Sequence, residues 1–107
     1  MSEKVLMAWV LETARQLNWL VYHTHDSRRS EPGFPDLVMC RKAPMIGQPS
    51  ELLVVELKTQ QGRTTRQQDA WLDHFRSAGI ETAVWRPAQC LDGTIVARLG
   101  RRRMWGG

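Results

Sequence analysis

The chain is poor in cysteine and has no long apolar run. Its 107 residues include two cysteines, Cys40 and Cys90, which stand far apart and form no CxxC pair. This usage argues against a zinc ribbon or a disulfide-rich fold, so we expect both thiols to be small core residues. No apolar stretch is long enough to span a bilayer, and we find no secretion signal at the N-terminus. We therefore expect a cytoplasmic location, in the bacterial host if the chain is phage-encoded.

Lysine is scarce as well. The basic residues are three lysines and twelve arginines, and the net charge is +4 at pH 7. Because the planar guanidinium matches phosphate geometry, this bias favours a polyanionic partner such as nucleic acid. The length and a hydrophobic content of 42% predict a single domain over residues 1–100. Residues 101–107 form a basic tail, which is either a disordered end or a source of further phosphate contacts.

Helical spacing of apolar residues predicts two main helices. The first covers residues 3–17, with Ser2 as N-cap, and one face carries Glu3, Met7, Val10, Ala14 and Leu17. The second covers residues 65–78, and its buried face carries Trp71, Leu72, Phe75 and Ala78. Residues 88–99 add a short helix or turn.

Four segments read as strands from their β-branched and aromatic content: 18–24, 36–41, 52–59 and 81–86. The segment 52–59 is apolar on both faces, as expected of a central strand. The last two strands are joined through the second helix by short loops. Such a crossover is right-handed, so these two strands should lie parallel.

Three polar residues stand at the ends of apolar runs. Glu56 and Lys58 close the run 52–58, and their spacing of two places them on the same strand face. Asp36 precedes a second apolar run within 33–39. If the two runs pair as neighbouring strands, Asp36, Glu56 and Lys58 gather at one end of the sheet.

Two carboxylates held together repel each other and lose hydration. A divalent cation relieves both costs, and oxygen ligands suit Mg2+ or Mn2+. Lys58 beside such an ion could orient or deprotonate a water, or neutralise charge on a phosphate. The pattern therefore favours metal-assisted phosphodiester chemistry.

Pro35-Asp36 followed by Glu56-Leu57-Lys58 resembles the PD-(D/E)xK nuclease superfamily. The longer stretches GFPDLV and VVELKTQQGRTTRQQDAWLDHFRSAGIETAVWRP are similar to the virus-type replication–repair nuclease (VRR-NUC) domain, in its phage and bacterial stand-alone form. The resemblance implies an α/β fold. Its αβββαβ order is that of a restriction-endonuclease-like core, with a central mixed sheet flanked by helices.

The resemblance also implies a set of metal ligands. They are the carboxylates of Asp36 and Glu56 and the carbonyl of Leu57, and Glu3 holds the site from the first helix, either directly or through another ligand. Glu3 could instead be a first-turn acid that complements the helix dipole. Glu12 is the rival acid on this helix, but it shares a stripe with polar residues, so we favour Glu3.

Gln68 allows two interpretations. It stands three residues after Thr65, the spacing of a capping box, and could satisfy a backbone donor there. In the family, the pattern that this chain matches from Gly62 to Gln68 places a glutamine beside the catalytic acids. There it contacts Lys58 or the attacking water, and we favour this role.

The polar loop before Asp36 is a candidate DNA contact. It offers hydroxyls and guanidiniums for phosphate oxygens at Ser27, Arg28, Arg29 and Ser30. Arg63, after the third strand, would hold a further phosphate. The alternative is a solvated loop that makes no DNA contact.

His23 and His25 invite a metal interpretation with Cys40 or Asp26. No fourth ligand has suitable spacing, so a zinc site is not favoured.

Together these features predict a metal-dependent, structure-selective DNA endonuclease. The small stand-alone members that the chain resembles are associated with four-way (Holliday) junctions, so branched DNA is the expected substrate. A junction needs two cuts, which predicts a homodimer, and Trp9, Trp19 and Trp85 are candidates for an apolar dimer patch. The alternative is a catalytically weak or inactive nucleic-acid-binding module. We expect neither a membrane partner nor a small-molecule cofactor.

Overall fold

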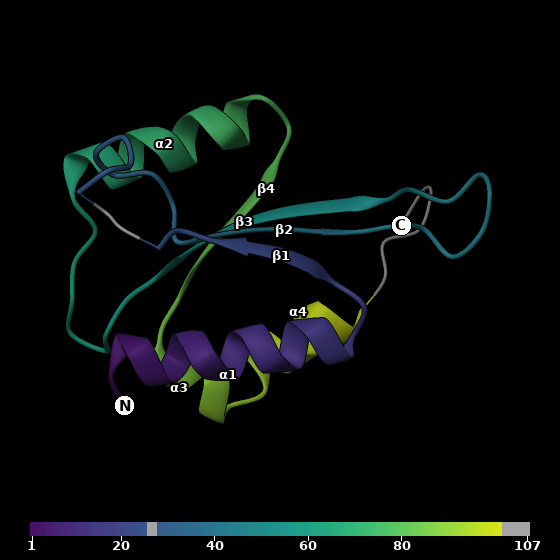
Figure 1. The fold of residues 1–107 in the computed structure, drawn as a ribbon, viewed down its shortest axis with the longest axis horizontal. Helices are drawn as coiled ribbons and strands as arrows, with labels where there is room; N and C mark the ends of the chain where they lie inside the picture. Colours follow the sequence, from purple (N-terminus) through teal and green to yellow (C-terminus); the bar gives the residue numbers. More distant parts are fainter. Residues whose placement is uncertain (26–27, 102–107) are drawn as a thin grey trace.

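The computed structural model describes residues 1–25 and 28–101 (Figure 1). Ser27, Asp26 and most of the basic tail lie outside the described residues. The elements follow in the order α1 (Glu3–Gln16), β1 (Leu20–His23), β2 (Leu37–Arg41), β3 (Glu51–Leu57), α2 (Arg66–Ser77), β4 (Glu81–Trp85), α3 (Pro87–Leu91) and α4 (Thr94–Gly100). No helix among these residues is long and apolar enough to cross a membrane.

The strands form one mixed sheet in the order β1-β2-β3-β4. β1–β2 and β2–β3 pair antiparallel, and β3–β4 pair parallel, as the crossover predicted. Figure 1 shows α2 on one face of the sheet and α1, α3 and α4 on the other. The α/β class, the order of elements and the mixed sheet flanked by helices are therefore confirmed. β1 starts two residues later than expected, because Asn18 adopts a left-handed φ of 71° and turns the chain after α1.

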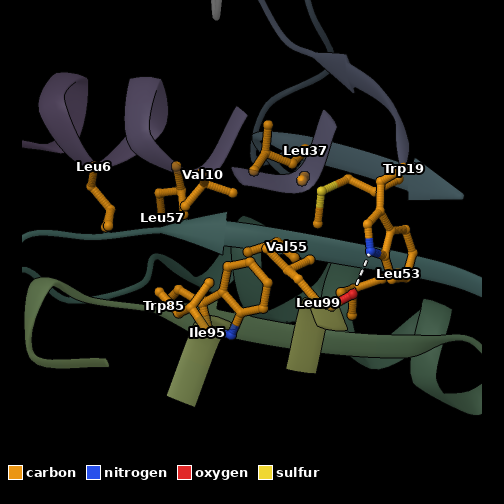
Figure 2. Packing of buried hydrophobic residues seen from close by; sticks show 12 residues of the cluster. Leu6, Val10, Trp19, Leu37, Leu53, Val55, Leu57, Trp85, Ile95 and Leu99 are labelled. Carbon is orange, nitrogen blue, oxygen red and sulfur yellow. Dashed lines mark hydrogen bonds between the residues drawn. The ribbon is translucent and has the colours of Figure 1, made fainter. Parts of the chain in front are cut away.

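The main core lies between the sheet and the layer of α1 and α4 (Figure 2). Leu6, Val10 and Ala14 are the fully buried residues of α1, whereas Met7 and Leu17 of the predicted stripe are only half-buried. The helix is therefore rotated slightly from the expected orientation. On α2, Leu72 is buried, but Ala78 is exposed, contrary to prediction, because the helix ends at Ser77.

Two expectations about side-chain burial were wrong. Trp19 and Trp85 are each only 3% exposed, so neither offers an apolar surface to a partner. The indole Nε1 of Trp19 donates to the Leu99 carbonyl at 2.9 Å, which ties the residue just before β1 to α4 (Figure 2). Cys40 is exposed rather than buried, because its neighbour Met39 takes the inward position on the alternating strand.

A buried ionic network closes the end of the sheet where β3 begins. Glu51 accepts from Arg41 Nε at 2.8 Å and from Arg98 Nη2 at 3.1 Å, and all three residues are buried. Arg98 also pairs with Glu81 at 2.6 Å. The Arg41 guanidinium lies 4.5 Å from the centre of the Trp19 ring. Nothing in the linear pattern pairs these charges, so the sequence did not predict this network.

The network also holds the C-terminal part of the domain. Arg41 Nη1 donates to the carbonyl of Leu99 and Nη2 to that of Arg101, each at 2.6 Å. These carbonyls end α4 and have no helical partner of their own, so the guanidinium caps the helix from the neighbouring strand. α4 is thus docked by both apolar packing and charge.

Replacing Glu51 with glutamine should lower the free energy of unfolding by about 3 kcal/mol, because two buried guanidiniums lose their shared carboxylate. Urea denaturation checks this. The exposed Glu12→Gln on α1 is the matched control and should stay within about 0.5 kcal/mol of the parent. A loss below about 1 kcal/mol for Glu51→Gln would contradict the role given to this carboxylate.

Candidate active site

Two acids meet at the end of the sheet opposite the ionic network. The register pairs Leu37 with Val55, so the next pair outward sets Asp36 opposite Glu56. Asp36 is fixed on both sides: its carbonyl accepts from Thr24 N at 2.9 Å, and its Oδ2 accepts from Leu57 N at 2.7 Å. β2 begins one residue later than predicted, because the Asp36 side chain, rather than its backbone, bonds to β3.

Glu56 is buried in an unfavourable electrostatic environment. The residue is 2% exposed, and its Oε2 has no hydrogen-bond partner within the described part of the chain. Burial, the hydrogen bond with the Asp36 side chain and the charge of that side chain raise the pKa of Glu56 to about 9. Without a cation, Glu56 therefore carries a proton at neutral pH. An unpartnered buried oxygen beside a second acid is the donor set that a hard cation would satisfy.

Lys58 lies just beyond the end of β3. Its backbone N donates to the Trp85 carbonyl at 3.0 Å, so the parallel strand β4 holds this part of the main chain. The positive charge of Lys58 lowers the pKa of Glu56, against the larger opposing effects. Asp36, Glu56 and Lys58 are thus brought together at one sheet edge. The carbonyl of Leu57 belongs to the same strand end, and its role as a ligand stays a prediction.

Glu3 lies in the first turn of α1, after the N-cap Ser2, and is exposed. Its negative charge contributes to the raised pKa of Glu56, so α1 does bring it towards the acid pair. However, residues 1–25 and 28–101 hold no group of three His, Cys, Asp or Glu side chains that could hold a metal ion. Glu3 is therefore near the pair, and its part in holding a metal ion, directly or through another ligand, stays a prediction.

The same finding bears on the two histidines. The rings of His23 and His25 lie 4.1 Å apart, yet no third ligand joins them among the described residues. Cys40, considered as a partner, is on a different part of the sheet: its register neighbours are Leu20 and Leu52. The structure gives no support to a zinc site there, and Asp26 lies outside what it describes.

Gln68 forms the capping box that its spacing allowed. Its Oε1 accepts from Thr65 N at 2.9 Å, and its own N–H donates to Thr65 Oγ1 at 3.1 Å. Gln68 also lines the pocket that contains Asp36 and Glu56. The cap therefore coexists with a position beside the acids, although the spacing alone suggested one role or the other. A contact with Lys58 or with water stays a prediction.

The pocket at the acid pair has a volume of about 290 Å3, and most of its wall is the loop before β2. That loop contributes Thr24, His25, Ser30, Glu31, Gly33 and Phe34. Thr24 was not among the predicted site residues, and its hydroxyl donates to the Pro35 carbonyl at 3.0 Å. The sequence held a signal for Thr24, because it is the last residue of the predicted strand 18–24, and in the structure its N–H donates to the Asp36 carbonyl.

Gly33 packs the loop against α2. It has a φ of +83°, and a Cβ there would lie 2.5 Å from the backbone carbon of Gln67. No larger residue fits this contact without moving the helix. Glycine in the GFPD stretch is therefore required to bring the loop, and with it Asp36, next to α2.

One of the predicted DNA-contact residues lines this pocket, and three others are exposed in the two loops that carry them. Ser30 lines it, and Arg28 and Arg29 are exposed in the same loop. Arg63 is exposed in the connection from β3 to α2. Contact with DNA stays a prediction for all four, and Ser27 cannot be placed because it lies outside the described residues.

The αβββαβ core, with an acid before one central strand and Glu-x-Lys at the end of the next, defines a nuclease of the PD-(D/E)xK type. The chain matches the VRR-NUC domain over residues 3–89 and belongs to that family. Neither a curated protein nor a solved structure matches it. Membership makes the chain a nuclease domain that binds DNA, in a superfamily that typically uses divalent metals.

The raised pKa of Glu56 predicts a pH dependence of stability in metal-free buffer. The folded pKa, about 9, lies above the ordinary 4.5, so the folded state retains a proton that the unfolded state releases between these values. The free energy of unfolding should therefore fall as pH rises through this range, by on the order of 2 kcal/mol at pH 7. Glu56→Gln should remove this fall in the free energy of unfolding with pH, so the variant should be more stable than the parent at pH 7–9.

Urea denaturation at several pH values, with a chelator present, measures the effect. Glu12→Gln serves as the control, because that exposed acid should leave the slope of stability against pH unchanged. Equal slopes for the parent and Glu56→Gln would show that Glu56 is ionised in the folded state, contrary to the prediction.

Proposed function

We propose that this protein is a Mg2+- or Mn2+-dependent endonuclease that hydrolyses phosphodiester bonds in branched DNA, with four-way junctions as its principal substrate. The observation that carries the proposal is the buried acid pair, in which Glu56 Oε2 has no partner within the described residues. A fold that only bound DNA would gain nothing from placing this oxygen beside Asp36.

The residues present fit a hard divalent ion. Asp36 and Glu56 would hold it with the carbonyl of Leu57, and Glu3 would act on it from α1. The ion, when bound, supplies positive charge for the scissile phosphate and makes a water more acidic. The hydrogen bond from Leu57 N already orients the Asp36 carboxylate, so Asp36 would need little rearrangement to bind the ion.

The remaining residues would position the DNA and the attacking water. Lys58 would orient that water or neutralise charge on the phosphate, and Gln68 would contact Lys58 or the same water. Phosphates to either side would be held from two loops, by Ser27, Arg28, Arg29, Ser30 and Arg63. The cytoplasmic location expected from the sequence stays part of this proposal.

A cleavage assay tests the catalytic assignment. Lys58→Ala and Asp36→Asn should each lower the rate of junction cleavage in Mg2+ or Mn2+ by at least roughly 100-fold, because each removes charge stabilisation from the reacting phosphate. Lys42→Ala is the control, since this exposed lysine follows β2 at the other end of the sheet. Undiminished cleavage by both site variants would remove this site from the mechanism.

Two further measurements refine the assignment. Mn2+ should raise the melting temperature of the wild type but not that of Asp36→Asn, whereas a binding-only module would gain little in either form. A panel of junction, fork, flap and linear substrates at a stated salt concentration gives the preferred DNA structure. Linear duplex cut as fast as junctions would contradict structure selectivity.

The homodimer needs a surface other than Trp19 and Trp85, which are buried. The sheet face opposite α1 carries an apolar row across three strands, formed by Leu20, Cys40 and Leu52 in register. Leu20 is 76% exposed and Leu52 38% exposed. α2 covers the β3–β4 side of this face and leaves the row open. A second copy seated here would bury the row and give one dimer two sites, as two cuts in a symmetric junction require.

Leu20→Lys should convert the protein from dimer to monomer in light scattering, because a buried lysine would face apolar side chains across the interface. Leu91→Lys is the matched control: Leu91 is 79% exposed and belongs to α3, which lies on the opposite side of the sheet (Figure 1). If the wild type is a monomer, or if Leu20→Lys remains dimeric, this interface is wrong.

A further inference from the structure

A second pocket, of about 310 Å3, lies next to the acid pocket and has no part in the mechanism above. Its lining is formed by Pro32 in the loop before β2 and by Gln67, Ala70, Trp71 and His74 on α2. The two pockets use the same two segments of the chain. In the loop, Pro32 lines this pocket and Gly33 lines the acid pocket. On α2, Gln67 lines this pocket and Gln68 lines the acid pocket.

The close contact of Gly33 with Gln67 therefore lies between the two pockets. A Cβ on Gly33 would lie 2.5 Å from the Gln67 backbone carbon, so the loop and the helix touch along this line. A ligand that reached from one pocket to the other would cross only this contact. Adjacent groups of one nucleic-acid strand, a phosphate and the base next to it, have this arrangement.

The lining suits a flat aromatic ligand. The Trp71 indole is half-buried and is held in place by Nε1, which donates to the Pro32 carbonyl at 3.2 Å. Phe34 packs edge-on against it, with ring centres 5.1 Å apart. A fixed, partly exposed indole offers a stacking surface to any base, because every base has a π-face. The exposed amide of Gln67 adds a donor and an acceptor for a base edge.

We propose that this pocket receives one unstacked nucleobase of the DNA strand whose phosphate occupies the acid pocket. The inference rests on the proposed function, since it is the acid pocket that places a phosphate next door. The volume lies at the lower end of the range for small-molecule sites, about 300–1,000 Å3, which suits a single ring system rather than a peptide helix. Unstacking costs least for a base that is mismatched or already unpaired, so the pocket would itself favour branched DNA that offers such a base over linear duplex.

The test measures binding rather than cleavage, in Ca2+, a hard cation that oxygen ligands can hold in the acid pocket, and a denaturing gel checks that every strand stays intact. A four-way junction is prepared with a single abasic site moved one nucleotide at a time along one strand. At one position, loss of the base should weaken binding to the wild type by roughly 5- to 100-fold. Ala70→Leu fills the pocket from an exposed helix position, so it should weaken binding to intact DNA by a similar factor. The abasic site at the sensitive nucleotide should then cause no further loss of affinity in this variant.

Ala97→Leu on α4 is the matched control, since it adds the same side chain at an exposed helix position outside the pocket. It should keep the wild-type response to the abasic site, and urea denaturation should show all three proteins folded. The proposal is overturned if the wild type binds every abasic junction as tightly as the intact one, or if the losses from Ala70→Leu and the abasic site simply add. It is also overturned if Ala70→Leu changes the oligomeric state while keeping the abasic response.

These results are separable from the failure of the nuclease proposal. If the pocket binds no base, the wild type should still cleave DNA in Mg2+ or Mn2+, and Lys58→Ala should still fail to cleave it. Conversely, a wild type that cuts nothing in Mg2+ or Mn2+ would refute the proposed activity, whereas the abasic experiment would still report on base binding.

Discussion

The site depends on the hydrogen bond from Leu57 N to the Asp36 carboxylate, 2.7 Å long, at the edge of the β2–β3 ladder. It extends the antiparallel register by one step and sets Asp36 opposite Glu56. The two acids are then held together by the same pairing that builds the sheet, so they cannot move apart without breaking it. The raised pKa of Glu56 is the cost of this arrangement, and a cation would remove it.

The buried carboxylates at the two ends of β3 differ in their hydrogen bonding. Glu51, at its start, is shared between two guanidiniums and has both oxygens bonded. Glu56, near its end, has an oxygen without a partner in the described residues. The first end serves the fold, because it docks α4 through Arg98, a residue beyond the stretch that matches the family. The second end leaves a buried carboxyl oxygen without a hydrogen-bond partner and a raised pKa, which is useful only if something else binds there.

Part of this was predictable from the linear pattern. The apolar runs indicated the strands, and the spacing of Glu56 and Lys58 put both on one face, so the family resemblance and the acid pair followed from the residues alone. The errors concern burial: Trp19, Trp85 and Cys40 were all assigned to the wrong environment. A tryptophan is large enough to belong in either place, and which face of a short strand is covered depends on helices that lie far away in the sequence.

By itself, the sequence determined the order of the elements, the family and the identity of the paired acids, because local periodicity and short motifs carry these directly. Only the tertiary structure decided that Glu3 stands near enough to the acids to raise the pKa of Glu56, that Gln68 caps α2 while lining their pocket, and that Arg41 and Arg98 share Glu51. Each of these depends on distances between elements remote in the chain. Such distances follow from how the helices pack on the sheet, and no local pattern specifies them.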